Sequence, residues 1–116
     1  MTINIKNINE QFSSCPQLTV DQVPEAVSAG FKTIINNRPD GEGGPEQPKS
    51  EEIRQAAESN GLKYVHIPVV QGQLTQAQVD ELAALLPDLP TPILGFCKGG
   101  VRAANIYQHA LVKSGQ

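Results

Sequence analysis

The chain has 116 residues, of which 39% are hydrophobic, and its nine basic and twelve acidic side chains give a net charge of −3. This length and composition are typical of one globular domain, so we expect residues 1–116 to form a single domain. The acidic balance argues against a broad surface for nucleic acid or for an anionic membrane. Any anion-binding site is therefore expected to be local.

The two cysteines, Cys15 and Cys97, belong neither to a C-x-x-C pair nor to a cluster of cysteine and histidine. We therefore expect no metal site, no cofactor and no disulfide framework. The N-terminus lacks the apolar stretch of a signal peptide, and the apolar runs are far shorter than the ~20 residues of a membrane span. These features predict a cytoplasmic protein with two free thiols, and they leave the oligomeric state open.

The first elements in chain order are a short edge structure and a helix. Apolar and polar residues alternate around Ile3 and Ile5, and a second short segment begins at Phe12, which indicates an N-terminal hairpin or pair of edge strands. Thr19 and Gln22 form a capping box, so a helix is predicted to begin at Thr19 and to end at Gly30.

Three buried strands and three further helices follow in alternation. The predicted strands cover residues 31–35, 62–70 and 92–96, and the predicted helices run from Ser50 to Asn60, from Thr75 to Pro87 and from Ala103 to Lys113. Alternating strands and helices predict an α/β fold in three layers, with a mostly parallel sheet of four to five strands and helices on both faces.

In such a sheet the ligand site lies beyond the carboxyl ends of the strands, where loops lead into helices. Two loops qualify. The first covers residues 36–48 and contains three glycines and three prolines, and the second covers residues 97–102.

The loop 97–102 carries the chemistry of the predicted site. Its two glycines allow successive backbone N–H groups to converge in front of a helix N-terminus, and this arrangement binds anions. The Arg102 guanidinium adds a fork for two oxygens of the same anion. A cysteine at this position favours the thiolate, so Cys97 is the expected nucleophile. The predicted anion-binding residues are Lys98, Gly99, Gly100, Val101 and Arg102. The alternative interpretation makes Cys97 a buried core cysteine beside an ordinary turn.

The motif C-x-x-G-x-R at Cys97, preceded by GFKTIINNRPDGE and GLKYVHIPV, resembles a bacterial family of small dual-specificity-phosphatase-like proteins. These nonclassical cysteine phosphatases are related to the phosphatase-like domain of β-lactamase-hydrolase-like proteins, and the resemblance covers residues 17–111. The resemblance implies a protein-tyrosine-phosphatase-like fold and hydrolase activity. In that reaction Cys97 would attack phosphorus and form a cysteinyl-phosphate, while Arg102 and the loop amides would bind the equatorial oxygens.

Two departures from the phosphatase pattern leave alternatives open. Four residues separate Cys97 from Arg102, whereas phosphatases have five. This shorter spacing also resembles the active loop of rhodanese sulfurtransferases, in which the cysteine carries a persulfide. In addition, no Asp or Glu occurs from Leu62 to Val79, where phosphatases of this kind carry their general acid. We expect Asp40, or else Glu42, to substitute, although Asp40 also suits a simple turn.

The sequence therefore predicts a cysteine-dependent phosphatase acting on a phosphorylated small molecule or phosphoprotein, including phosphotyrosine or phosphoserine. A sulfurtransferase using the same thiol and a non-catalytic phosphate-binding module are the alternatives. Arg38 is expected to pair with the loop acids or to add charge to the anion site, and a solvated loop arginine is the equal alternative. We expect His66 to be a hydrogen-bonded structural residue, Lys98 to be a rim charge and Cys15 to be structural.

Overall fold

The computed structural model of the protein describes residues 2–114, whose centre is a five-stranded sheet in the order β1-β2-β5-β3-β4. The strands are β1 (Lys6–Asn7), β2 (Phe12–Cys15), β3 (Thr33–Asn36), β4 (Lys63–His66) and β5 (Ile93–Phe96). Neighbours among β2, β5, β3 and β4 pair in parallel, and β1 pairs antiparallel with β2 at the edge. The predicted mostly parallel sheet is confirmed.

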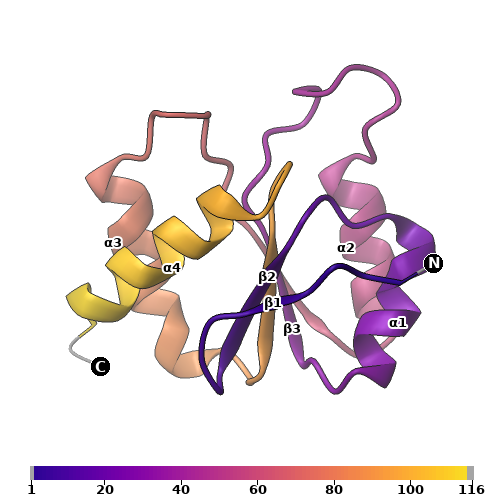
Figure 1. Cartoon of the computed structure of the whole chain (residues 1–116), viewed down its shortest axis with the longest axis horizontal. Coiled ribbons are helices and arrows are strands. Elements are labelled where there is room, and N and C mark those ends of the chain that lie inside the picture. Colours follow the sequence, from indigo (N-terminus) through magenta and orange to yellow (C-terminus); the bar gives the residue numbers. More distant parts are fainter. Residues whose placement is uncertain (1, 115–116) are drawn as a thin grey trace.

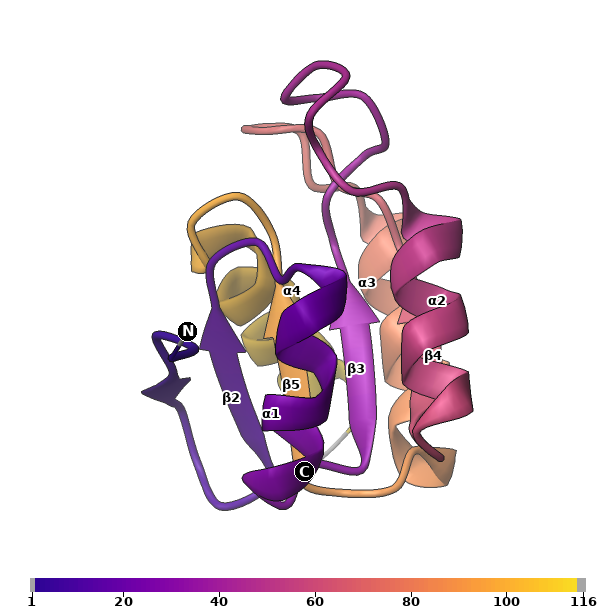
Figure 2. The same cartoon turned by 90° about the vertical axis from the view of Figure 1, so that its right-hand side faces the viewer.

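Helices cover both faces of this sheet. They are α1 (Val23–Ser28), α2 (Ser50–Ser59), α3 (Gln76–Leu85) and α4 (Val101–Lys113), with two 3₁₀ turns, η1 (Val20–Gln22) and η2 (Leu86–Asp88). Figures 1 and 2 show α1 and α2 on one face and α3 and α4 on the other, which confirms the three layers. None of the helices within residues 2–114 has the length and apolarity needed to cross a membrane.

The central strands are buried because their alternate side chains enter two separate cores. Ile34 and Leu94 pack into the core under α1 and α2, whereas Ile35 and Ile93 pack into the core under α3 and α4. Successive strand residues point to opposite faces of a sheet, so a strand covered on both sides reads as a continuous apolar run.

Two helix starts differ from the prediction. The segment after Thr19 begins as the 3₁₀ turn η1 and becomes α-helical only at Val23. This shift places Pro24 in the first turn of α1, where its missing N–H removes no helical hydrogen bond. The last helix begins at Val101 rather than at Ala103, because Gly100 ends the preceding loop in a left-handed conformation with φ of +99°.

The predicted strand 62–70 pairs only over Lys63–His66. After His66 the chain stays hydrogen-bonded to the end of β3 and to Asn37. The Ile67 N–H donates to the Asn36 carbonyl and the Val69 N–H donates to the Asn37 carbonyl, each at 3.0 Å. This extended segment therefore reaches the edge of the sheet where the ligand site is predicted.

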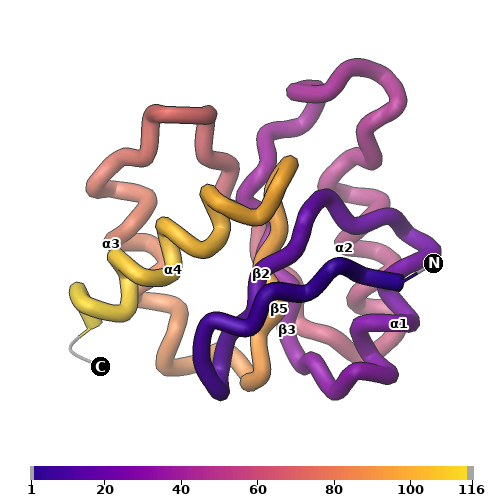
Figure 3. The backbone as a smooth tube through the Cα atoms, viewed as in Figure 1, coloured from indigo at the N-terminus to yellow at the C-terminus, as the bar shows by residue number. Residues whose placement is uncertain are grey.

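Three loops rise together from that edge. Figure 3 traces the connection from β3 to α2, the connection from β4 to α3 and the loop from β5 to α4 at the same end of the sheet. Because these strands are parallel, their carboxyl ends share one edge, and the predicted ligand-binding edge is formed by the same three connections.

Candidate active site

Cys97 lies directly after β5, at the start of a four-residue turn into α4. The Gly100 N–H donates to the Cys97 sulfur at 3.1 Å, so the turn folds back over the thiol. Cys97 is 1% exposed, which places its sulfur at the base of the turn rather than on the surface. A backbone N–H at the start of a 13-residue helix stabilises negative charge on that sulfur.

The turn is pressed against the end of β2. Cys15 is the register partner of Phe96, and a Cβ atom on Gly100 would lie 3.3 Å from both the carbonyl carbon and the oxygen of Cys15. The Gln17 N–H also donates to the Lys98 carbonyl at 3.2 Å. Both the positive φ and the close approach therefore require glycine at position 100.

Arg102 lies in the first turn of α4 and is almost fully buried, with 7% of its surface exposed. Its Nη1 donates to one oxygen of Glu42 at 2.7 Å and to the Val69 carbonyl at 2.8 Å, and its Nη2 donates to the other oxygen of Glu42 at 2.8 Å. A guanidinium has five N–H groups, and among residues 2–114 these three hydrogen bonds leave one on Nε and one on Nη2. These two lie along one edge of the group and form a second fork.

Glu42 is shared between two arginines. Arg38 Nε donates at 2.8 Å to Glu42 Oε1, the oxygen that also accepts from Arg102 Nη2. This confirms that Arg38 pairs with a loop acid. The Arg102 hydrogen bond, with a further one from Arg38, lowers the pKa of Glu42 to about 2. Glu42 is therefore a carboxylate at neutral pH and has no proton to donate.

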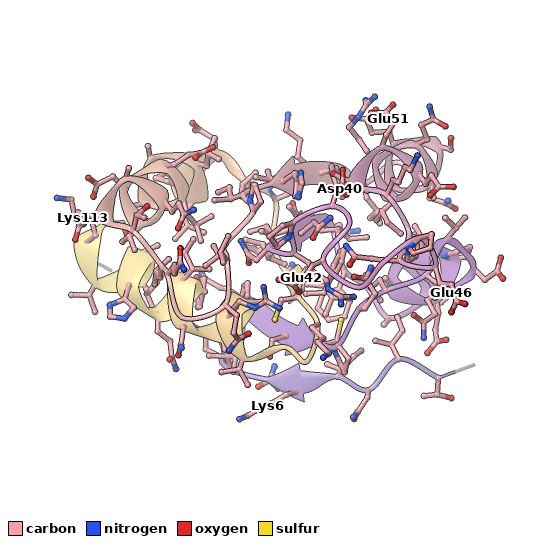
Figure 4. The ribbon with its side chains drawn as sticks, turned by 90° about the horizontal axis from the view of Figure 1, so that it is seen from above. Lys6, Asp40, Glu42, Glu46, Glu51 and Lys113 are labelled. Carbon is pink, nitrogen blue, oxygen red and sulfur yellow. The ribbon has the colours of Figure 1, made fainter. Side chains whose placement is uncertain are left out.

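The same pairing affects Arg102. The hydrogen bond to Glu42 raises the pKa of Arg102, and the charge of a Cys97 thiolate raises it further. Cys97 begins the loop and Arg102 lies in the first turn of the helix that follows it, so the two predicted functional residues lie at the same edge of the sheet. Viewed from above, Figure 4 places Glu42 near the centre of the molecule.

Asp40 lies elsewhere. One of its carboxylate oxygens accepts from the Ser50 N–H at 2.8 Å, at the N-terminus of α2. Figure 4 shows Asp40 displaced from Glu42 toward that helix. Ser50, at which the helix is predicted to start, is the first helical residue of α2, and Lys49 is the N-cap. Asp40 therefore binds the N-terminus of α2 in this structure and is not brought to Cys97.

The remaining predicted residues take structural or peripheral positions. The His66 ring bonds the Arg38 carbonyl at 3.0 Å, which confirms a hydrogen-bonded structural role. Lys98 is exposed. Burial, followed by the charge of Cys97, raises the pKa of Cys15 to about 12, so Cys15 stays protonated. Within residues 2–114, no three His, Cys, Asp or Glu side chains are arranged to hold a metal ion.

Sequence reasoning missed two neighbours of the loop 97–102. The Val69 carbonyl accepts from Arg102, and the Gln17 N–H donates to the Lys98 carbonyl at 3.2 Å. A backbone carbonyl has no signal in the sequence, because every residue carries one. Gln17 follows the end of β2, and its place at this edge could have been inferred only from the strand order.

The comparisons with known proteins identify the family and the fold. Residues 4–114 match the family model described as "Beta-lactamase hydrolase-like protein, phosphatase-like domain". The chain belongs to this family. It is 36% identical over 100 residues to a β-lactamase hydrolase-like protein of Agrobacterium fabrum, a match that covers 86% of this chain and 23% of that protein. A protein of the same description from Xylella fastidiosa is 32% identical, with 98% and 26% covered. The chain thus spans about a quarter of these relatives.

Solved structures support the same fold. A candidate phosphatase from Neisseria meningitidis is 31% identical with a TM-score of 0.80, and the match covers 89% of this chain and 72% of that one. TpbA from P. aeruginosa, crystallised in complex with phosphotyrosine, has a TM-score of 0.66 at 15% identity, with 97% and 65% covered. This phosphatase-like domain therefore has the protein-tyrosine-phosphatase-like fold that the sequence resemblance implied.

Proposed function

We propose that this phosphatase-like domain hydrolyses phosphomonoesters, with Cys97 as nucleophile and Arg102 as the anion-binding side chain. The observation that carries the proposal is the orientation of Arg102. Glu42 and the Val69 carbonyl take three of its N–H groups, and the Nε–Nη2 edge is left for an anion held at Cys97. The N–H groups of the loop at the start of α4 supply further donors to phosphate oxygens.

The reaction has two steps. The Cys97 thiolate attacks phosphorus, an S–P bond forms, the ester O–P bond breaks, and the alcohol or phenol leaves with its electron pair. Water then attacks the cysteinyl-phosphate, the S–P bond breaks, and inorganic phosphate leaves with the thiolate regenerated. Two N–H groups of Arg102 hold the equatorial oxygens through both steps.

Protonation of the leaving group is the weak part of this site. Glu42 is the carboxylate that contacts Arg102, and its pKa of about 2 keeps it ionised at neutral pH. General acid catalysis typically contributes ~10²- to 10⁴-fold. We therefore propose that the protein favours esters of acidic alcohols or phenols, which leave as anions without help.

A direct test compares hydrolysis of an activated aryl phosphate by the wild-type chain and by Cys97→Ser and Arg102→Lys. Cys97→Ser removes the nucleophile and should abolish turnover. Arg102→Lys keeps the charge but loses the fork, so kcat/KM should fall about 100-fold or more. Equal rates for wild type and Cys97→Ser would contradict the proposal.

Sulfur transfer is a second candidate, and the loop length favours it. Only four residues separate Cys97 from Arg102, so the ring offers one amide fewer than a phosphatase loop of C-x5-R spacing. With thiosulfate, the Cys97 thiolate would take the outer sulfur and release sulfite, and cyanide would then remove that sulfur as thiocyanate. This reaction needs no general acid. Thiocyanate production that requires Cys97, without phosphate release from aryl esters, would select this function.

A further inference from the structure

A groove opens beside Arg102, on the side away from β2. Its cavity measures about 470 Å³ and lies between the β4–α3 connection, the start of α3 and the exposed face of α4. Val101 and Arg102 line one end of this groove, so the groove adjoins the proposed anion site at Arg102. A volume of this size holds a small organic molecule.

The groove has a distinct chemical character. Its polar lining residues are Gln71, Thr75, Gln76, Arg102, Asn105 and His109, and the others are apolar or glycine. None is an acid, in a chain whose net charge is −3, and none is Phe, Tyr or Trp. The polar groups are amides, one hydroxyl and two side chains that can carry positive charge. Such a lining suits an anionic ligand better than an aromatic one.

The two basic side chains lie at a defined separation. His109 follows Arg102 by seven residues within α4, close to two full turns, so both project from the same side of the helix. Two turns correspond to a rise of about 10 Å. Asn105 lies one turn after Arg102 and lines the groove between them.

From this arrangement we infer that the groove binds the part of the substrate that leaves, and that this part carries a second oxyanion at the His109 end of the groove, two helical turns from Arg102. The inference rests on the proposed function, because it takes Cys97 and Arg102 as the site of the first phosphate. His109 receives the second oxyanion through a ring N–H, and the amide of Asn105 binds polar groups of the spacer. The substrate class is a small molecule with two phosphates, or with a phosphate and a carboxylate.

The test measures binding rather than turnover. Calorimetry on Cys97→Ser compares hexyl monophosphate, hexanediol bisphosphate and the six-carbon carboxylate that carries a terminal phosphate. We expect the bisphosphate to bind roughly tenfold more tightly than the monophosphate, as one charge-assisted hydrogen bond would provide. The phosphocarboxylate distinguishes the two sources of the second oxyanion, because a carboxylate site would favour it over the bisphosphate.

His109→Ala, made in the same Cys97→Ser background, should remove that advantage and leave monophosphate affinity unchanged. His109→Gln should recover part of it. Lys113→Ala is the matched control, because Lys113 lies on the same helix and pairs with Asp80 outside the groove lining. Loss of the advantage in His109→Ala but not in Lys113→Ala supports the inference.

Three results would overturn the inference. They are equal affinity for monophosphate and both dianionic ligands, an advantage that persists in His109→Ala, and no binding of any of the three ligands. Failure of the proposed function is a separate result, namely no aryl phosphate hydrolysis by the wild-type chain. A His109-dependent affinity would support the groove even in that case.

Discussion

The guanidinium of Arg102 binds both carboxylate oxygens of Glu42, at 2.7 and 2.8 Å, although 60 positions separate the two residues in the chain. The contact joins the loop after β3 to the first turn of α4. It also fixes which edge of the guanidinium is available for an anion. We therefore propose that Glu42 is a positioning residue for Arg102, and several predictions depend on this contact.

Glu42→Gln should weaken the site. The substitution removes the charge that holds the Arg102 fork, so we expect kcat/KM for an aryl phosphate to fall about tenfold, mainly through a higher KM. Glu46→Gln is the matched control, because Glu46 lies in the same loop and Figure 4 shows it away from Glu42. An increase in kcat/KM for Glu42→Gln would instead mean that Glu42 competes with substrate for Arg102.

The same contact should make stability depend on pH. The pKa of Glu42 is lowered from 4.5 to about 2 in the folded chain, so the ionised form is stabilised by folding. This contribution is fully present above about pH 4.5 and is lost as the pH falls toward about 2. In urea unfolding at neutral pH, the free energy of unfolding should therefore be higher for the wild-type chain than for Glu42→Gln. This difference should shrink as the pH falls from about 4.5 to about 2. A difference independent of pH would contradict the assignment.

Gly100→Ala should disrupt the turn, whereas Gly99→Ala should be tolerated. Gly100 has φ of +99° and would place a Cβ 3.3 Å from the Cys15 backbone, whereas Gly99 has nothing within 4 Å of such an atom. The left-handed conformation alone costs roughly 1–2 kcal/mol for a non-glycine residue. Chemical denaturation and phosphate binding measured on both variants check this prediction. Equal stabilities would show that the turn adapts.

Asp40→Ala should reduce stability without changing the chemistry. Asp40 accepts from the Ser50 N–H at the start of α2, and loss of such a contact typically costs ~1 kcal/mol. We expect a lower unfolding midpoint but an unchanged dependence of kcat on pH. If wild-type kcat falls as the pH rises and this fall is absent in Asp40→Ala, Asp40 is instead the general acid.

A series of aryl phosphates tests whether the leaving group receives a proton. Because Glu42 is ionised, we expect kcat to rise steeply as the leaving phenol becomes more acidic, provided that formation of the cysteinyl-phosphate limits the rate. A general acid would flatten this dependence. A shallow dependence in the wild-type chain that steepens in one carboxylate variant would locate that acid.

The order of elements and the position of the loop 97–102 could be predicted because each depends on local patterns. The apolar run Ile93–Phe96, the two glycines and the following helix lie within one short stretch of sequence. The strands that end at Asn36 and Phe96 pair in register, which brings their following loops together. The sequence could therefore indicate which loops share an edge of the sheet.

The side-chain partners within that edge could not be predicted in the same way. Asp40 and Glu42 flank Gly41, which has φ of +79° and reverses the direction of the loop. Asp40 consequently reaches α2 and Glu42 reaches Arg102. Either acid was compatible with the sequence as a partner of the site, because the choice depends on the conformation of one glycine-rich turn.

The most direct test of the account is to look for the covalent intermediate. The wild-type chain is mixed with an activated aryl phosphate, quenched within milliseconds and examined by peptide mass spectrometry. We predict one phosphate on the peptide that contains Cys97, and none in Cys97→Ser. Turnover by the wild-type chain without a phosphorylated Cys97 peptide, or with the phosphate on another residue, would contradict the central claim that Cys97 is the nucleophile.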